Sequence, residues 1–271
     1  MIKQAIIPLA GLGTRLLPLT SIFAKELLPI NGKPGIEYIL DECIEAGIKE
    51  VIFIISKKKE MIKKYFYNDS FYKKIIKKKK DKRILKEYKK ILKYKKMIKF
   101  VYQNKPMGTG DAVLKTRRFI KDNFFLMLLP DDLIIKKNCS KSMIKIHKNF
   151  KSGVIASMTV NKKNVSRWGI FELKKKINRD NFFVQNVVEK PSIKNAPSNK
   201  AVIGRYILPK SIFEKLLKQR PGKQGEIHIT DAIRSLIKDN KRFIAHNFTG
   251  KYLDCGTMNG YIKSSMEISK L

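Results

Sequence analysis

Short apolar runs alternate with amphipathic stretches over the first part of the chain. The runs at 3–10, 50–56, 97–103, 124–132 and 153–160 predict buried strands, because each is short and almost continuously apolar. The stretches at 34–47, 109–120 and 140–150 carry apolar residues at helical spacing, so they predict helices between the strands. This order predicts an α/β fold with a doubly wound, mainly parallel, Rossmann-like sheet.

The pattern becomes richer in strands after Trp168. Strands are predicted at 168–173, 182–190, 201–208 and 242–248, helices at 211–218 and 228–238, and a short tip at 251–256 before a final helix. We therefore expect a β-rich, substrate-binding part that folds onto the same mixed sheet. The 271 residues hold no internal repeat, so we expect one domain over 1–271 with its two halves meeting near residue 135.

Lysine dominates the charge. The chain has 59 Lys and Arg against 23 Asp and Glu, a net charge of +36, which raises nucleic acid or a membrane surface as partners. The excess is spread along the chain and arginines are few, which argues against nucleic-acid binding as the main function. The densest stretch, about 57–96, predicts a lysine-rich helical insertion with solvated cations; an anion-attracting arm is the alternative.

The cysteines and the apolar runs bear on the compartment. Three scattered cysteines without a CxxC pair predict free buried thiols in a reducing cytoplasm. No run reaches the roughly 18 apolar residues of a membrane helix. The N-terminus also lacks the features of a signal peptide, so we expect a cytoplasmic protein without a membrane partner.

The stretch AGLGTRLLP directly follows the first predicted strand. Gly11 and Gly13 allow backbone N–H groups to approach a phosphate, and Arg15 offers a planar fork of donors. The stretch is not a P-loop, which needs GxxxxGK[ST], and Leu16 replaces the third glycine of a dinucleotide fingerprint. It predicts a phosphate-binding loop, with an ordinary tight turn as the alternative.

Further charged residues follow other predicted strand ends. Lys25 lies in a polar loop that can reach the same edge of the sheet, and Asp131 follows a buried strand in LLPDD. VVEKP supplies Glu189 and Lys190, and YLDCG supplies Asp254. Carboxylates are the hard ligands that Mg²⁺ prefers. Each feature alone also fits a solvated lysine, a turn, a cap or a surface ion pair.

The combination of GLGTRLLP with the following KELLP resembles the sugar-nucleotide pyrophosphorylases, nucleotidyltransferases that act on sugar 1-phosphates. The resemblance runs from Ile6 to about Tyr261. It implies the nucleotide-diphospho-sugar transferase type of fold, with a nucleotide-binding half at about 1–135 and a sugar-phosphate-binding half at about 136–271.

The resemblance also implies roles for individual residues. Arg15, Lys25 and Lys190 would be catalytic, and Asp131 and Asp254 would bind Mg²⁺ as the cofactor. The implied nucleotide-binding set is Leu9, Ala10, Gly11, Gly13, Thr14, Glu26, Gln103 and Gly108. The implied sugar-phosphate-binding set is Gly169, Glu189, Lys190 and Gly204.

Within this family, Glu26 favours members that use UTP, because members that use dTTP typically carry glutamine there. The resemblance therefore implies UTP and glucose 1-phosphate as substrates, and UDP-glucose and pyrophosphate as products, formed by in-line attack without a covalent intermediate. A related enzyme for dTTP, CTP or another sugar 1-phosphate stays open, as does a basic nucleic-acid-binding regulator, which would be expected to lack Lys25, Asp131 or Asp254.

The chain departs from the family pattern at a few positions. Ala24, Asp111 and Trp168 stand where the family often has proline, histidine and tyrosine. Relatives typically continue with more helix after the segment around Tyr261. This additional helical tail commonly contributes to subunit contacts in the family, so a homo-oligomer is possible and its size is left open.

Overall fold

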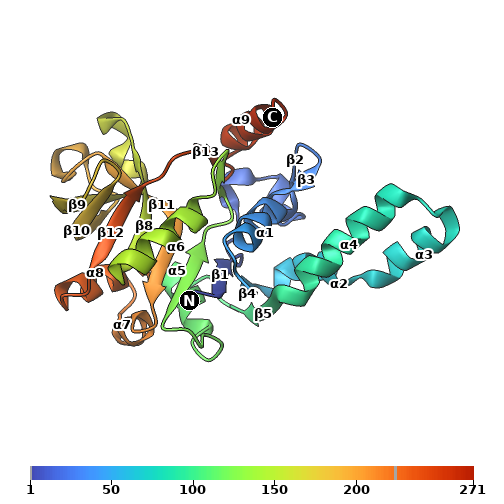
Figure 1. Cartoon of the computed structure of the whole chain (residues 1–271), viewed down its shortest axis with the longest axis horizontal. Helices are drawn as coiled ribbons and strands as arrows, with labels where there is room; N and C mark the ends of the chain where they lie inside the picture. Colours follow the sequence, from blue (N-terminus) through green and yellow to red (C-terminus); the bar gives the residue numbers. More distant parts are fainter. Residues whose placement is uncertain (1, 223–224) are drawn as a thin grey trace.

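The computed structural model describes residues 2–222 and 225–271. Its centre is a nine-stranded sheet with the order β5-β4-β1-β6-β11-β8-β12-β10-β9 within these residues (Figure 1). The strands are β1 (Gln4–Pro8), β4 (Glu50–Ile55), β5 (Ile98–Tyr102), β6 (Phe124–Leu128), β8 (Gly153–Thr159), β9 (Gly169–Lys176), β10 (Asn181–Glu189), β11 (Lys200–Pro209) and β12 (Phe243–Asn247).

Strand direction differs between the two halves of the sheet. β5, β4, β1 and β6 pair in parallel, as expected for strands joined by helices. β11 runs antiparallel to both β6 and β8, and β10 runs antiparallel to both β9 and β12, whereas β8 and β12 are parallel. The predicted α/β mixed sheet is confirmed, and parallel pairing dominates only its first half. The short link between β9 and β10 permits only an antiparallel pair.

Helices cover both faces of the sheet. Ala5 and Ile7 of β1 pack into a core with α1 (Gly35–Glu45), α2 (Glu60–Tyr67), α4 (Lys82–Met97), α6 (Cys139–Phe150) and α9 (Met258–Ile268). Ile6, on the opposite face, packs with α5 (Gly108–Lys115), α7 (Ile212–Lys218) and α8 (Ile229–Lys238). Strand residues alternate between the two faces, which explains why the central strands are apolar throughout.

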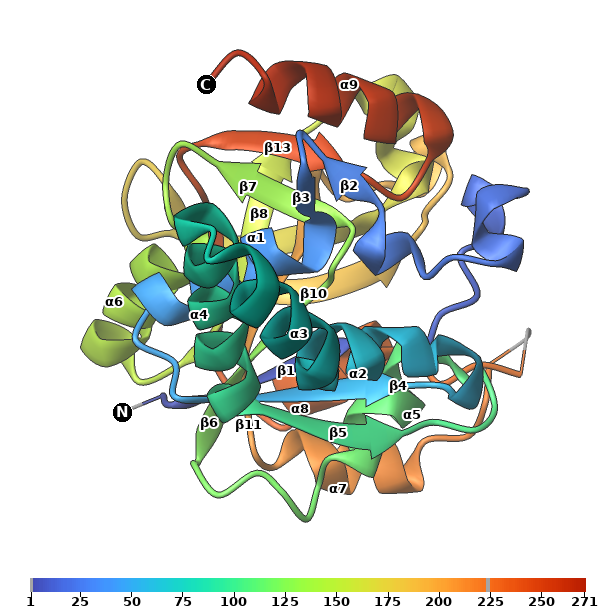
Figure 2. The same ribbon diagram turned by 90° about the vertical axis from the view of Figure 1, so that its right-hand side faces the viewer.

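The lysine-rich stretch forms η4 (Lys57–Lys59), α2, α3 (Asp69–Lys79) and α4. The hairpin of α3 and α4 extends away from the sheet in Figure 1 and lies in front of it in Figure 2. The lysines of α3 are exposed. Helices α2 and α4 are held to α1 by two phenol hydroxyls: Tyr65 of α2 donates to Glu37 at 2.5 Å, and Tyr94 of α4 donates to Asp41 at 2.6 Å. The stretch is helical, and most of its lysines are exposed, but Lys59 is buried.

Two small ribbons complete the fold. β2 (Pro29–Ile30) pairs with β3 (Lys33–Pro34), and β7 (Asp132–Ile135) pairs with β13 (Lys251–Asp254). The second ribbon brings the C-terminal part of the chain to the end of β6. Short 3-10 turns occupy the loops: η1 (Thr14–Leu16), η2 (Leu19–Ser21), η3 (Lys25–Leu27), η5 (Lys162–Arg167) and η6 (Ile193–Asn195).

Three further expectations can be compared directly with the structure. The helix predicted at 109–120 ends at Lys115, because the Thr116 hydroxyl donates to the Val113 carbonyl at 2.6 Å and the chain turns. The three cysteines are free and buried, as predicted. Within 2–222 and 225–271, helices of the length and apolarity needed to cross a membrane are absent.

Candidate active site

A cavity of about 430 Å³ lies at the carboxyl ends of β1, β5 and β6. Strand ends of a parallel sheet meet at one edge, so loops that are distant in sequence converge there. Of the predicted residues, the cavity wall contains Ala10, Gly11, Gly13, Thr14, Lys25, Glu26, Gln103, Gly108 and Asp131. Leu9 lies just beneath, fully buried, and its N–H donates to the Ile54 carbonyl at 2.7 Å.

The glycine-rich loop is held in a defined conformation. Gly13 has a φ of +71°, in the left-handed region that favours glycine, and its carbonyl accepts a hydrogen bond from the Thr20 hydroxyl at 2.8 Å. A Cβ at Gly11 would have no neighbour within 4 Å, so the loop there is open to a ligand. Arg15 follows in η1 with 61% of its side chain exposed.

Lys25 and Arg15, the two predicted catalytic residues of the N-terminal loops, both form ion pairs with Asp131. The Lys25 ammonium lies 2.7 Å from its Oδ2, and the Arg15 Nη2 lies 3.4 Å from the same oxygen. Burial opposes ionisation of both partners, but the ion pair outweighs it. The pKa of Asp131 is therefore lowered by Lys25, and the pKa of Lys25 is raised by Asp131 and Glu26. Both groups are charged near neutral pH.

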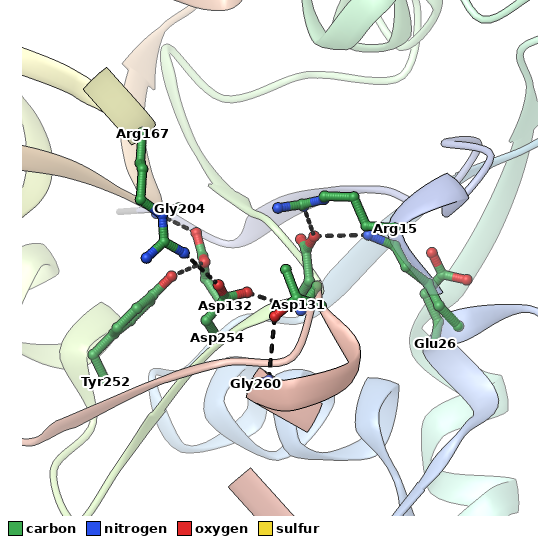
Figure 3. A network of polar contacts seen from close by, with 12 residues as sticks. Arg15, Glu26, Asp131, Asp132, Arg167, Gly204, Tyr252, Asp254 and Gly260 are labelled. Atoms are coloured by element: carbon green, nitrogen blue, oxygen red, sulfur yellow. Dashed lines mark hydrogen bonds and ion pairs between the residues drawn. The ribbon is translucent and has the colours of Figure 1, made fainter. Parts of the chain in front are cut away.

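Asp254 is brought beside Asp131 by the β7–β13 ribbon. The N–H of Cys255 donates to the Asp131 carbonyl at 2.7 Å, and the N–H of Gly256 donates to Asp254 Oδ1 at 2.9 Å. A Cβ on Gly256 would lie 2.7 Å from Arg15 Nη2, 2.8 Å from Asp131 Oδ2 and 3.2 Å from Asp254 Oδ1. The two carboxylates and the guanidinium therefore surround one point that only glycine leaves open (Figure 3).

This pair of carboxylates fits a divalent cation of the magnesium type. Mg²⁺ is commonly held by one or two carboxylates, with waters and substrate phosphates filling its other positions. Clusters of three or more His, Cys, Asp or Glu side chains in metal-binding arrangement do not occur among the described residues. A bound substrate would therefore have to complete the coordination.

Asp132, the second acid of the DD pair, has a different environment. The Tyr252 hydroxyl donates to its Oδ1 at 2.6 Å, and the Gly204 N–H donates to its Oδ2 at 2.9 Å. Burial and the neighbouring Asp131 raise the pKa of Asp132 to about 6. A side chain at Gly204 would collide with this carboxylate. Gly204 thus lies beneath the acidic loop, where it anchors Asp132.

A buried ion pair supports the same loop from below. Arg205 is fully buried, and its Nη2 lies 2.8 Å from Glu42 of α1. Its Nη1 also donates to the Leu129 carbonyl at 3.1 Å. A buried pair of this kind is costly to break because either partner would be left as an unpaired charge. The interior position of an arginine was not evident from the apolar pattern of β11.

Glu26 is paired with a lysine from the insertion. The Lys59 ammonium lies 2.7 Å from Oε1 and 2.8 Å from Oε2 of Glu26, and both side chains are buried. The pKa of Lys59 is lowered by burial, although Glu26 opposes the shift. Sequence reasoning missed Lys59, since it belongs to a run of three lysines and its two neighbours are exposed.

The predicted sugar-phosphate residues lie around the end of β10. Glu189 accepts a hydrogen bond from the Thr230 hydroxyl at 3.1 Å, and a Cβ at Gly169 would lie 3.3 Å from its Oε2. Lys190 has a φ of +44°, and its N–H donates to the Trp168 carbonyl. Its side chain is exposed and, within the described residues, forms no ion pair with Asp131 or Asp254.

One further residue joins this region to Asp254. Arg167, in η5, places its Nη2 3.4 Å from Asp254 Oδ2 (Figure 3). Its guanidinium also lies over the Trp168 ring. Sequence reasoning did not select it, because nothing in the local pattern separates it from other exposed cations.

Comparisons with known proteins agree with this arrangement. The model of the nucleotidyl transferase family matches residues 4–270. A UTP–glucose-1-phosphate uridylyltransferase 2 of Streptococcus pyogenes serotype M3 is 37% identical over 272 residues, covering 98% of this chain and 90% of the relative.

Solved structures give the same result. A UDP-glucose pyrophosphorylase complexed with UDP-glucose superimposes with a TM-score of 0.88 at 36% identity, covering 100% of this chain and 99% of the other. A UTP-bound UGPase from Acinetobacter baumannii gives a TM-score of 0.89 at 33% identity, covering 99% and 93%. The fold, the converging strand-end residues and these matches establish that the chain belongs to the nucleotidyl transferase family.

Proposed function

We propose that this protein transfers the uridylyl group of UTP to α-D-glucose 1-phosphate, forming UDP-glucose and releasing pyrophosphate. The observation that carries the proposal is the convergence of Lys25, Arg15 and Asp254 on Asp131 beside the cavity of the glycine-rich loop. The names and bound ligands of the similar proteins support UTP and a glucose phosphate as substrates.

The nucleotide would lie in the cavity with its phosphates along the glycine-rich loop. Gly11 and Gly13 leave the backbone accessible to phosphate oxygens, and the exposed Arg15 would hold the departing pyrophosphate. Lys25 is held at the acidic loop and would stabilise charge at the α-phosphate.

The sugar phosphate would approach from the side of β9 and β10. Glu189, beside Gly169, would accept hydrogen bonds from sugar hydroxyls. Lys190 would orient the phosphate of the sugar, and its exposed side chain is free to turn toward a ligand. The phosphate oxygen is already ionised near neutral pH, so the attack on the α-phosphorus needs no general base. Catalysis then consists of positioning and charge stabilisation.

Asp131 and Asp254 would hold Mg²⁺, which acts as a Lewis acid on the phosphates when it is bound. Without the metal, Lys25 and Arg15 neutralise Asp131. The buried free thiols fit a reducing compartment, and we place the reaction in the cytoplasm.

The decisive experiment measures pyrophosphate release from UTP, dTTP and CTP, each with several sugar 1-phosphates, with and without Mg²⁺. We expect release with UTP and glucose 1-phosphate, and none after the metal is removed with EDTA. If pyrophosphate is released only with a different nucleotide or sugar 1-phosphate, the protein is a nucleotidyltransferase with substrates other than those proposed. No release from any pair would refute the enzymatic function.

A further inference from the structure

Gln103 presents an amide at the wall of the nucleotide cavity, and one residue controls how that amide is turned. Gln103 follows β5 and is only 4% exposed. Its Nε2 donates to Oδ2 of Asp111 at 2.8 Å and to the Gly108 carbonyl at 3.2 Å. Asp111 is buried in the first turn of α5. The nitrogen end of the amide is therefore fully used within the protein.

The orientation of the amide follows from the chemistry of its neighbours. A carboxylate and a carbonyl can only accept hydrogen bonds, so the NH₂ group must face them. The Lys115 ammonium lies 3.3 Å from Oδ1 of Asp111, so one carboxylate oxygen pairs with this cation and the other accepts from Gln103. The opposite orientation would place Oε1 of Gln103 against two acceptors, which is repulsive.

The remaining polar atom is Oε1. Within the described residues no protein group donates to it, and it is absent from the polar atoms that are buried without a partner. It is thus an accessible acceptor in the wall of the cavity. Gly108, whose carbonyl accepts from the amide, has a φ of +92°, and a Cβ there would be 2.7 Å from the Ile227 carbonyl, so only glycine fits at this position.

We propose that Asp111 is a positioning residue: it holds Gln103, which the family resemblance already assigns to nucleotide binding, with its oxygen toward the ligand, so that the site selects a pyrimidine carrying hydrogen on N3. Uracil has an N3–H that can donate to this oxygen, whereas cytosine has an unprotonated N3 that would face it lone pair to lone pair. The inference rests on the proposed function, since it assumes that the cavity holds the base of a nucleoside triphosphate. It gives a use to the unexpected aspartate at this position.

The test replaces Asp111 by asparagine, which keeps the shape but supplies a donor. Its NH₂ could donate to Oε1 of Gln103, so the glutamine amide could turn over and present its own NH₂ to the ligand. Affinities for UTP and CTP are measured by equilibrium titration of the wild-type protein and of Asp111→Asn. Turnover with both nucleotides is measured in parallel. Glu267→Gln, the same acid-to-amide change on α9 far from Gln103, is the matched control.

We expect wild type to prefer UTP and the preference for UTP over CTP to fall roughly ten- to a hundredfold in Asp111→Asn, with Glu267→Gln unchanged. UTP and CTP both bind only the folded molecules. Partial unfolding of the variant therefore affects both affinities equally and cancels in the ratio of the UTP affinity to the CTP affinity. Equal weakening of both nucleotides, or an unchanged ratio, would overturn the inference and leave Asp111 a structural role. Failure of the proposed function would be seen separately, as normal nucleotide binding without pyrophosphate release in wild type.

Discussion

The ammonium of Lys25 lies 2.7 Å from the carboxylate of Asp131, although 106 positions separate them in the chain. The ion pair joins the loop after β1 to the loop after β6, which are adjacent parallel strands. Each loop supplies one charged side chain, and the ion pair with the other loop holds that side chain beside the cavity. The pair positions the lysine beside the cavity and keeps the aspartate ionised for a metal or a phosphate-bound cation.

Loss of either charge should impair catalysis more than folding. We expect Asp131→Asn and Lys25→Met to lower kcat by roughly 30- to 1,000-fold, because a charge contact to the transition state contributes about 2–4 kcal/mol. Steady-state assays of pyrophosphate release measure the effect. Asp239→Asn, at the end of α8, is the control and should retain full activity. Near-normal turnover in either site variant would contradict the assigned roles.

A single methyl group at Gly256 should disturb the site. Alanine there would place Cβ within 2.8 Å of both Arg15 Nη2 and Asp131 Oδ2, so the guanidinium and the carboxylate must move apart. We expect Gly256→Ala to lower kcat by at least about tenfold. Gly222→Ala is the comparison, since its Cβ would meet nothing closer than 3.6 Å. If both variants are equally active, the contact region at Gly256 has no catalytic importance.

Lys59 should matter although it lies in the lysine-rich insertion. Lys59→Met would leave Glu26 buried without its cation, at a cost of about 3–5 kcal/mol of unfolding free energy. The adjacent Lys25 would then be the nearest cation available to Glu26, so turnover should fall as well. Chemical denaturation and kcat measurements check both effects.

Two variants make this prediction specific. Lys58→Met changes an exposed neighbour in the same turn and should leave stability and activity as in wild type. Glu26→Gln combined with Lys59→Met removes the unpaired charge and should recover most of the lost stability. Equal loss of stability in the double and the single variant would show that Lys59 does not act through Glu26.

His246 should make stability depend on pH in the acidic range. Burial lowers the pKa of His246 below its ordinary value of 6.5, against the opposing effect of Asp180. The unfolded chain then binds more protons than the native protein below pH 6.5. This stability is fully present above pH 6.5 and is lost as the pH falls through the folded-state pKa.

Urea unfolding of wild type and His246→Gln between pH 5 and 7.5 tests this dependence. The unfolding free energy of wild type should fall relative to that of His246→Gln as the pH is lowered, because only wild type carries the imidazole. His147, whose pKa burial also lowers, remains in both proteins and cancels in the comparison. A constant difference over the whole range would contradict the prediction.

Much of the fold could be predicted because local patterns encode it. The apolar runs that became β1, β4 and β6 are short and bounded by loop signals, and α1 begins after Pro34 and is followed by Gly47 with a φ of +86°. The reversed direction of β11 and β10 was not evident, because an isolated strand carries no mark of its partner's direction.

The site could be predicted only in part, for the same reason. The glycine-rich loop, Lys25, Asp131 and Asp254 each stand in a recognisable local stretch. Lys59 and Arg205 do not: one is a lysine among lysines, and the other is an arginine in an apolar strand. Their importance comes from burial beside Glu26 and Glu42, which belong to distant segments.

The sequence by itself determined which residue types stand at the ends of which strands, because periodicity and glycine placement act over a few neighbouring residues. The tertiary structure decided which of these side chains meet. Only the pairing of β7 with β13 brings Asp254 to Asp131. Only the packing of α5 on the sheet places Asp111 against Gln103. Such contacts depend on distances between segments far apart in the chain, and local sequence does not specify those distances.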